Sequence, residues 1–509
     1  MDKILILDFG SQYTQLIARR VRELKVYCEI YPYYVSFDKI CSLSPKGIIL
    51  SGSPASVRFK NHPEPEKKIF TLNIPILGIC YGMQIIAHLF KGKIKFAPEE
   101  GKIREYGPAH LTVLEKDPLF SSITKSRVWM SHGDTIEKIP ADFISLACTE
   151  KIKNAAFRHK KLPIYGVQFH PEVYHTEKGR EIFANFLFKI CAVRPEWTMQ
   201  NFLVQKIREI KEAVGKEKVL CAVSGGIDST VLAFLLKEAV GSNLHCLFVD
   251  NGLLRKGEKE EVRKNLARAL PLHYINAQRR FLECLKGISD PEEKRKAIGE
   301  AFIRVFETYS RDIKYLAQGT LYPDVIESRS FYGGPSAKIK THHNVGGLPL
   351  DLRFKLIEPL KELFKDEVRK LGRILKVPKA ILERHPFPGP GLAVRIIGEV
   401  TKESLDTLRE ADYILIEELK RSGFYNKTWQ AFAIFLPVKT VGVMGDERTY
   451  ENVIALRVVT SRDGMTADWA KLPPNLLEKI SNRIIQEVKG INRVVYDLST
   501  KPPATIEWE

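Results

Sequence analysis

The stretch from Val219 to Ser229, VLCAVSGGIDS, places the strongest limit on how this chain can fold. An apolar run breaks into two glycines and continues at once into an aspartate, a serine and a helical pattern. Because Gly225 and Gly226 lack a Cβ atom, the backbone can turn sharply and bring its N–H groups close to an anion. The dipole of the following helix adds to that attraction. We therefore expect a strand, a phosphate-binding loop and a helix in succession, although an ordinary turn before a core helix would have the same pattern.

The side chains of this loop suit a nucleotide phosphate. Ser224 and Ser229 supply hydroxyl donors, and Asp228 can hold a magnesium ion or orient a donor. No lysine closes the loop, which separates it from the GxxxxGK[ST] loop of the common triphosphatases. The string SGGIDS resembles the pyrophosphate loop of the N-type ATP pyrophosphatases, which split ATP between the α and β phosphates. The resemblance implies ATP with Mg²⁺, and it implies ATP contacts at Ser224, Gly225, Gly226, Ile227, Asp228, Ser229 and Val249.

Composition narrows the class of protein. A chain of 509 residues is expected to form about three domains. Its amino terminus has no secretory signal and no stretch is apolar enough to span a membrane, so we expect a cytoplasmic protein with no membrane partner. The eight cysteines form no CxxC pair, which argues against zinc and disulfide frameworks. Scattered lysines account for much of the net charge of +18, which favours small anionic substrates over nucleic acid.

The order of apolar and polar segments predicts an α/β protein: two open parallel-sheet α/β domains followed by a smaller α+β C-terminal domain. Pro195 marks the end of the first domain, and the string RHPFPGPG around His385 interrupts every periodic pattern. The expected domains are residues 1–193, 194–385 and 386–509. Expected buried strands of the first domain are Lys3–Asp8, Ile48–Gly52, Ile76–Cys80 and Ile164–Phe169.

The sequence GICYG, residues 78–82, has the pattern of a nucleophile elbow, with Cys80 at the turn between a strand and a helix. A thiol at a helix amino terminus is favoured as the thiolate, the form that attacks. A cysteine can equally be a small buried apolar residue, so a base is needed to decide. The string FHPE supplies one: alternation along an extended chain places Glu172 to hold the imidazole of His170 while the ring faces the cysteine.

GICYG together with HPE resembles the class I glutamine amidotransferases over about residues 3–191. The resemblance implies that Cys80 attacks the side-chain amide of glutamine, with His170 and Glu172 as its catalytic partners. It also implies an oxyanion hole formed by Gly52 and the N–H of Tyr81. Many relatives have a second glycine where Ser53 stands in this chain. The positions matching glutamine-binding residues are Gln84, Ser131, His132, Gly133 and Asp134.

The segment 318–350 is rich in glycine and polar residues and is too long for a simple connection. Such loops often close over a reaction and exclude water, although a flexible linker has the same composition. The adjacent histidines of HHNVGG have no further histidine or cysteine cluster to complete a metal site.

An amidotransferase followed by an ATP pyrophosphatase indicates that ammonia made at one site is used at another. The strings HPFPGPGLAVR, SRDGMTADWAKLP and KPPATIEWE resemble the GMP synthetases. The resemblance implies amination of xanthosine 5′-monophosphate (XMP) through an O2-adenylyl intermediate, giving GMP, AMP and pyrophosphate, in a homodimer joined through the last domain. It implies lid residues Asp324, Glu327, Lys340 and His342. It implies XMP contacts at Arg295, Asp366, Gln430, Arg493, Lys501, Ile506 and Glu507.

Two other enzymes share the ATP loop. A tRNA-modifying enzyme would use the basic surface, but it would need sulfur-carrying cysteines after residue 284, where this chain has none. An NAD synthetase shares the reaction type but gives no reason for the ending KPPATIEWE. XMP, ATP and glutamine are therefore the expected small-molecule substrates.

Overall fold

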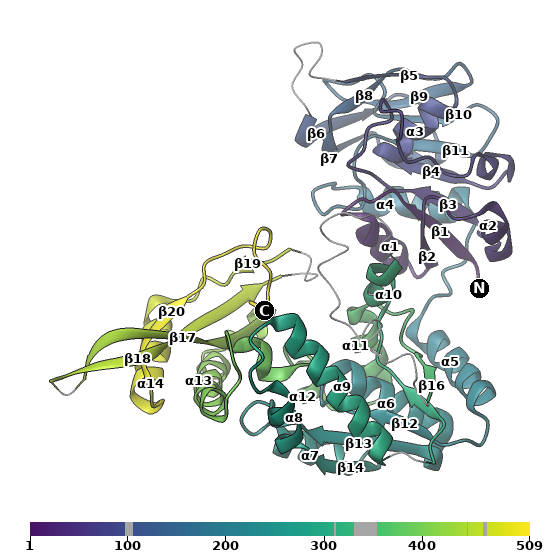
Figure 1. The fold of residues 1–509 in the computed structure, drawn as a ribbon. Coiled ribbons are helices and arrows are strands. Elements are labelled where there is room, and N and C mark those ends of the chain that lie inside the picture. The colour runs from purple at the N-terminus through teal and green to yellow at the C-terminus, as the bar shows by residue number, and fades with distance from the viewer. Residues whose placement is uncertain (97–104, 310–311, 330–353, 445, 462–465) are drawn as a thin grey trace. The chain divides into compact units, whose positions relative to one another are not determined.

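The computed structural model describes residues 1–96, 105–309, 312–329, 354–444, 446–461 and 466–509 (Figure 1). These residues form two compact units, which divide between Phe202 and Leu203. Each unit has its own hydrophobic core. No helix within the described ranges is long and apolar enough to cross a membrane.

The first unit is built on a nine-stranded sheet with the order β2-β1-β3-β4-β11-β10-β9-β6-β7. Its first five strands are parallel, and the remaining four continue the sheet in antiparallel fashion. The parallel strands are β1 (Lys3–Asp8), β2 (Tyr27–Pro32), β3 (Gly47–Leu50), β4 (Ile76–Ile79) and β11 (Ile164–Val167). The antiparallel strands are β6 (Glu105–Val113), β7 (Lys125–His132), β9 (Phe143–Cys148) and β10 (Ala156–His159).

Burial along the strands explains these two halves. Every residue of β3, β4 and β11 is buried, as expected of parallel strands covered on both faces. Strand β7 instead alternates between buried and more exposed residues, the pattern of a strand covered on one face. A separate pair joins β5 (Lys93–Phe96) to β8 (Asp134–Lys138). The helices are α1 (Thr14–Glu23), α2 (Phe37–Leu43), α3 (Tyr81–Leu89) and α4 (Gly179–Ala184), the last continued by a π-helix over Asn185–Ile190.

The second unit contains a five-stranded, fully parallel sheet with the order β14-β13-β12-β15-β16. Successive strands run outward from β12 to one side as far as β14, and then the chain returns to the other side at β15. Ligands of open α/β sheets bind at such a reversal, beyond the carboxyl ends of the strands. The strands are β12 (Val219–Ala222), β13 (Leu244–Asp250), β14 (Leu272–Asn276), β15 (Tyr315–Ala317) and β16 (Lys355–Ile357).

Helices accompany this parallel sheet. The chain enters the second unit through α5 (Met199–Val214), which begins three residues before the division at Phe202. The other helices are α6 (Ile227–Val240), α7 (Glu258–Leu266), α8 (Gln278–Leu285), α9 (Pro291–Tyr309), α10 (Tyr322–Arg329), α11 (Lys365–Ile374) and α12 (Lys379–Leu382).

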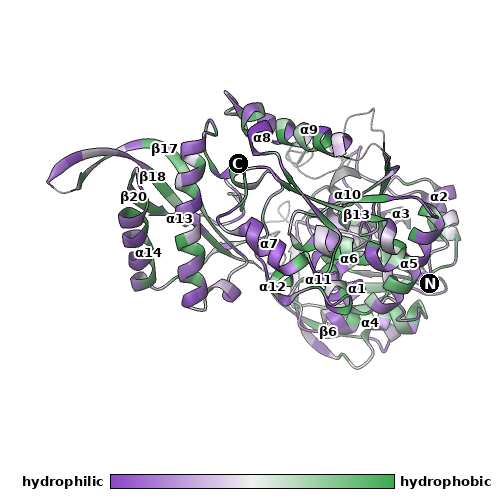
Figure 2. Ribbon diagram, turned by 90° about the horizontal axis from the view of Figure 1, so that it is seen from below, coloured by the Kyte–Doolittle hydropathy of each residue, from purple (hydrophilic) through white to green (hydrophobic). Residues whose placement is uncertain are grey.

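The last part of the second unit is a four-stranded sheet with two helices. Strand β18 (Glu447–Thr460) pairs with β17 (Gln430–Met444), β19 (Asp468–Trp469) and β20 (Ile491–Tyr496). Beyond the sheet, β17 and β18 continue as a two-stranded ribbon (Figure 1). Figure 2 shows hydrophilic and hydrophobic residues along both α13 (Lys402–Arg421) and α14 (Pro474–Glu487). In α13 the buried residues recur at helical spacing, so one face packs on the sheet. The α/β and α+β character expected from the sequence is confirmed.

Candidate functional sites

Cys80 occupies a sharp turn between β4 and α3. Its φ of 52° is unusual for a residue with a side chain. Two glycines make the turn possible. A Cβ atom on Gly82 would lie 2.3 Å from the carbonyl oxygen of Leu50, and one on Gly78 would lie 2.4 Å from the backbone of Gly82. Only glycine allows α3 to cross the strands this closely, which is the geometry that the GICYG string predicts.

The thiol of Cys80 is nearly buried, with 5% of the residue exposed. The side-chain amide of Gln168 lies with its nitrogen 3.7 Å from Sγ, and the carbonyl oxygen of Ser131 is also 3.7 Å away. The sequence analysis did not identify Gln168, which is fully buried in the segment joining β11 to His170. Its place just before the FHPE string was the only available signal.

His170 and Glu172 follow β11, the parallel neighbour of β4, so both reach the edge where β4 ends in Cys80. The Nδ1 atom of His170 lies 2.6 Å from Oε1 of Glu172, and both residues are buried. Burial alone would lower the pKa of His170, but the charge of Glu172 and the contact with Cys80 raise that pKa well above its ordinary value. The structure therefore brings together the three residues expected from the two separate strings.

The expected oxyanion residues lie beside this cluster. A Cβ atom on Gly52 would come within 3.4 Å of the ring carbon Cε1 of His170, so the backbone at Gly52 lies directly against the imidazole. Tyr81 is the first residue of α3, and its hydroxyl donates to the carbonyl oxygen of Pro63 at 2.7 Å.

The expected glutamine-binding residues surround the turn between β7 and β8. Ser131 and His132 end β7, Gly133 forms the turn and Asp134 begins β8. The side chains of Gln84 and His132 both contact the carbonyl oxygen of Asp134, each at 2.9 Å. These bonds join the turn to α3.

Glu105 is a further buried residue that the sequence analysis did not identify. One of its carboxylate oxygens lies 3.3 Å from Nε2 of His132. Neither carboxylate oxygen has a hydrogen-bond partner in the described part of the chain.

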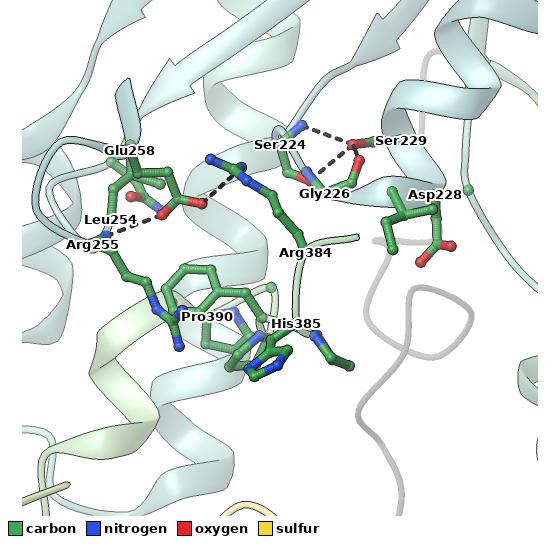
Figure 3. Close-up of a pocket in the computed structure, with 18 of the residues that line it drawn as sticks. Ser224, Gly226, Asp228, Ser229, Leu254, Arg255, Glu258, Arg384, His385 and Pro390 are labelled. Carbon is green, nitrogen blue, oxygen red and sulfur yellow. Dashed lines mark hydrogen bonds and ion pairs between the residues drawn. The ribbon is translucent and has the colours of Figure 1, made fainter. Parts of the chain in front are cut away.

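The second site is a cavity of about 2190 Å³ in the second unit. The loop after β12 forms one wall, as the reversal of strand order beside β12 predicts. Within the loop, the Ser229 hydroxyl accepts the N–H of Ser224 at 3.1 Å, and the Ser224 hydroxyl accepts the N–H of Gly226 at 3.3 Å (Figure 3). Gly225 has a φ of 80°, and a Cβ atom there would lie 2.4 Å from Val262. The loop is therefore already held in a compact shape.

Asp228 is the second residue of α6, the helix that follows the loop, and it lines the cavity. Its Oδ2 atom pairs with the ammonium group of Lys365, the first residue of α11. The other carboxylate oxygen, Oδ1, is buried and has no partner among the described residues. Asp228 therefore keeps one acceptor for a cation or donor.

Arg384 is a cation of this cavity that the sequence analysis missed. Its guanidinium pairs with Glu258 on α7 (Figure 3). It also donates to the carbonyl oxygen of Gly225 at 3.0 Å and pairs with Glu261, another residue of α7. It thereby joins the phosphate-type loop to α7. Arg384 stands in the RHPFPGPG string, but the string gave only a domain boundary.

Among the expected XMP contacts, Arg295, Gln430 and Glu507 line the cavity. The carboxylate of Glu507 accepts two hydrogen bonds from the fully buried Arg395, at 3.0 and 3.2 Å, and one from Gln430. Arg395 was also missed by the sequence analysis. Its guanidinium carbon lies 4.1 Å from the ring centre of Phe432.

The other expected contacts do not line the cavity. Asp366 pairs with Lys370 along α11, and the exposed Arg493 lies on β20. Lys501 bridges to Ala467, and Ile506 packs on the β17 and β18 residues Phe432, Ile434 and Ala455. Of the lid residues, Asp324 and Glu327 lie on α10, where Asp324 lines the cavity. Lys340 and His342 lie outside the described residues.

Three family models match successive parts of the chain. Their descriptions are glutamine amidotransferase class-I over residues 5–190, thiamine biosynthesis protein over residues 214–284, and GMP synthase C terminal domain over residues 417–508. A glutamine-hydrolyzing GMP synthase from Carboxydothermus hydrogenoformans is 58% identical over 514 residues, which is 100% of both chains. A protein of the same name from Aquifex aeolicus is 56% identical over 99% of both chains. Another from Thermosipho melanesiensis is 56% identical over 100% of both chains.

Proposed function

This chain belongs to the family of glutamine-hydrolysing GMP synthases, and on that basis we propose how its residues divide the reaction. It is a ligase that uses glutamine as nitrogen donor and ATP to form GMP. The observation that carries this conclusion is the similarity to GMP synthases over the full length of the chain. The arrangement of Cys80, His170 and Glu172 supports the assignment of the first half-reaction.

In the first half-reaction, Sγ of Cys80 attacks the side-chain amide carbon of glutamine. His170 accepts the thiol proton and returns it to the nitrogen, which leaves as ammonia. Water then attacks the resulting thioester and releases glutamate. Glu172 fixes the ring orientation and stabilises the protonated imidazole, for which its 2.6 Å contact and complete burial are suited.

Backbone N–H groups stabilise the negative oxygen that forms during this attack. We assign this role to Gly52 and Tyr81, because Gly52 lies against the His170 ring and Tyr81 opens the helix after Cys80. The turn formed by Ser131, His132, Gly133 and Asp134, held by Gln84, receives the remainder of the glutamine molecule.

In the second half-reaction, the loop from Ser224 to Ser229 and the backbone at Val249 bind ATP. The first turn of α6 offers the N–H groups and the dipole that attract phosphate. Asp228 fits a magnesium ion, because its buried Oδ1 atom has no partner in the described structure. Bound Mg²⁺ would neutralise charge on the phosphates.

The oxygen at C2 of XMP attacks the α-phosphorus of ATP and pyrophosphate leaves. Ammonia then displaces AMP from C2 to give GMP. Glu507 can accept hydrogen bonds from purine N–H groups, and Gln430 and Arg295 lie in the same cavity. By resemblance, we assign further XMP contacts to Asp366, Arg493, Lys501 and Ile506. We assign formation of the adenylate to Asp324, Glu327, Lys340 and His342.

A homodimer formed through residues 386–509 is part of the same proposal. Apolar residues on the β17–β18 ribbon are exposed, with exposed fractions of 53% for Val441, 73% for Val443 and 60% for Tyr450. A second copy of this domain would cover them. We also propose the domain boundaries at 193 and 385, and a cytoplasmic location, where ATP and glutamine are abundant.

The test uses the full chain with Cys80→Ala. We expect glutamine-dependent GMP formation to fall at least about 1000-fold while formation with added ammonium stays within twofold, because only the first site uses the thiol. Cys41→Ala is the matched control, since Cys41 is an exposed cysteine of the same unit. It should leave both activities unchanged.

Loss of ammonium-dependent activity in the Cys80 variant would contradict two separable sites. Absence of GMP formation by the unaltered enzyme with either nitrogen donor would contradict the proposed function itself.

A further inference from the structure

A group of three potential metal ligands lies in the first unit, and the reaction described above uses none of them. His62 and Glu64 stand on the segment after β3, and His88 is in the last turn of α3. One ligand atom from each residue lies within 4.8 Å of the other two. The sequence analysis could not find this group, because His88 is separated from the other two by more than twenty residues.

The hydrogen bonds of His62 define the state of its ring. Nδ1 lies 2.7 Å from the carbonyl oxygen of Phe59, to which it can only donate. In the neutral ring, Nε2 then carries a lone pair, yet it lies 2.9 Å from the carboxylate oxygen Oε1 of Glu64. Two acceptors facing each other at this distance need a cation or a proton between them. Metal-binding histidines usually have this arrangement, in which one ring nitrogen donates a hydrogen bond to a backbone carbonyl oxygen and the other nitrogen is directed at the metal.

His88 completes the group from the opposite side. Its ring stands edge-on to that of His62, with ring centres 5.0 Å apart and an interplanar angle of 85°. Within the described ranges, neither of its ring nitrogens has a hydrogen-bond partner. Lys67 contacts Glu64 at 3.2 Å, but its side chain is 68% exposed and free to move away.

We propose that His62, Glu64 and His88 bind a divalent transition-metal ion of the zinc class. Two imidazole nitrogens and one carboxylate oxygen form a ligand set that zinc prefers, with water as the fourth ligand. Tetrahedral zinc with bonds of about 2.0–2.1 Å requires ligand atoms about 3.3 Å apart. Nε2 of His62 and Oε1 of Glu64, which are 2.9 Å apart, need to separate slightly. Rotation of the exposed His88 side chain then brings its ring nitrogen to the same spacing.

The ion would join two segments that meet at the glutamine site. Pro63, between the two loop ligands, accepts the hydrogen bond of Tyr81, which is the residue after Cys80. A metal ion at this position therefore fixes the loop against α3 and stabilises the first unit. The site differs in place and in chemistry from the proposed magnesium site at Asp228, which belongs to the second unit.

The test measures zinc binding by the full chain against a chromophoric chelator, with millimolar Mg²⁺ present. Cys80→Ala is used as the background, because a thiol beside His170 is itself a zinc ligand. We expect this variant to bind one zinc ion that Cys80→Ala/His88→Ala does not bind. Zinc should also raise the melting temperature of the first variant and leave that of the second unchanged.

Two further variants distinguish zinc binding at this site from non-specific binding to surface histidines and from an effect of misfolding. Cys80→Ala/His110→Ala removes an exposed histidine on β6 and should keep the ion. Cys80→Ala/Glu64→Gln preserves shape and should lose it, with an unchanged circular dichroism spectrum. The proposal is overturned if the background variant binds no zinc, or if the His88 and Glu64 variants bind as much as the His110 variant.

Discussion

At the scale of single residues, the charge of Glu172 decides the state of His170. The carboxylate is fully buried, so its attraction for the imidazolium is weakly screened. The raised pKa of His170 therefore depends on a charge as well as on a hydrogen bond.

Glu172→Gln keeps the shape of the side chain and removes this charge. We expect the pKa of His170 to fall and glutamine hydrolysis to decrease about 100-fold or more, since the ring loses both its orientation and its stabilised protonated form. The pH profile of glutamine hydrolysis measures this change, with ammonium-dependent GMP formation as an internal reference. Glu181→Gln, an exposed glutamate on α4, should change neither quantity.

A second histidine shows the opposite effect. Burial lowers the pKa of His385 to about 4. The ring stacks on Tyr425, with centres 3.8 Å apart, and its Nε2 donates to the carbonyl oxygen of Tyr425 at 2.8 Å. The buried Nδ1 has no partner in the described structure, so the ring is neutral.

This lowered pKa makes the stability of the second unit depend on pH. Between about 4 and the ordinary value of about 6.5, the unfolded chain binds a proton at this ring and the folded chain does not. The contribution of the neutral His385 ring to the unfolding free energy is therefore fully present above about pH 6.5. It is lost as the pH falls, by ~2 kcal/mol at pH 5. Urea unfolding at pH 7 and pH 5 should show that His385→Gln loses this share of the pH dependence. His273 is an exposed histidine on β14, and the control variant His273→Gln should keep the full pH dependence.

At the scale of elements, the close crossing of α3 over β3 positions the thiol. Gly82→Ala would place a Cβ atom 2.3 Å from the Leu50 carbonyl oxygen, so the helix must move. We expect a loss of about 1–3 kcal/mol in unfolding free energy and a large loss of glutamine hydrolysis. Gly299→Ala in α9, where a Cβ atom meets nothing within 4 Å, should keep or slightly raise stability. Equal losses in both variants, measured by thermal unfolding, would contradict this explanation.

Local sequence patterns predicted the buried parallel strands well, because a strand that is covered on both faces has a continuous apolar run. Strand β1 was expected over Lys3–Asp8 and is found there. Strand β17 runs over Gln430–Met444, but its sequence indicates a strand only beyond a proline. Pro437 made the run look interrupted. The structure accommodates it where the register shifts between Leu436 and Thr440, since proline is tolerated at such irregularities.

Distant contacts were beyond prediction from the sequence. Arg384 reaches Gly225 across 159 residues, and Arg395 reaches Glu507 across 112. Neither arginine has a neighbouring pattern that indicates its partner, because the partner is chosen by tertiary packing. The cysteine, histidine and glutamate of the first site were predictable because they stand in short local patterns. The strained turn requires glycines on both sides of the cysteine, and the histidine and glutamate follow directly after a buried strand. The antiparallel half of the first sheet had no comparable marker.

At the scale of the whole molecule, the two units have separate hydrophobic cores, and the proposed function gives them separate ligands. We expect calorimetry of the full chain to resolve two unfolding transitions. ATP with Mg²⁺ at about 100 times its dissociation constant should stabilise one of them by ~2.7 kcal/mol and leave the other unchanged. Cys80→Ala should not alter this shift. A single transition that moves as a whole would show that the units unfold together.

The fully buried Lys294 on α9 pairs with Glu509 at 2.6 Å, across 215 residues of chain. During synthesis on the ribosome, this ammonium group emerges long before its counter-ion exists. A buried charge that loses its partner is strongly destabilising, so the second unit reaches its final packing only after Glu509 has been translated. A chain that ends before Glu509 would leave the Lys294 ammonium group with only the backbone carbonyl oxygens of Ala393 and Ile396 as acceptors, so its second unit would be less stable than that of the full chain.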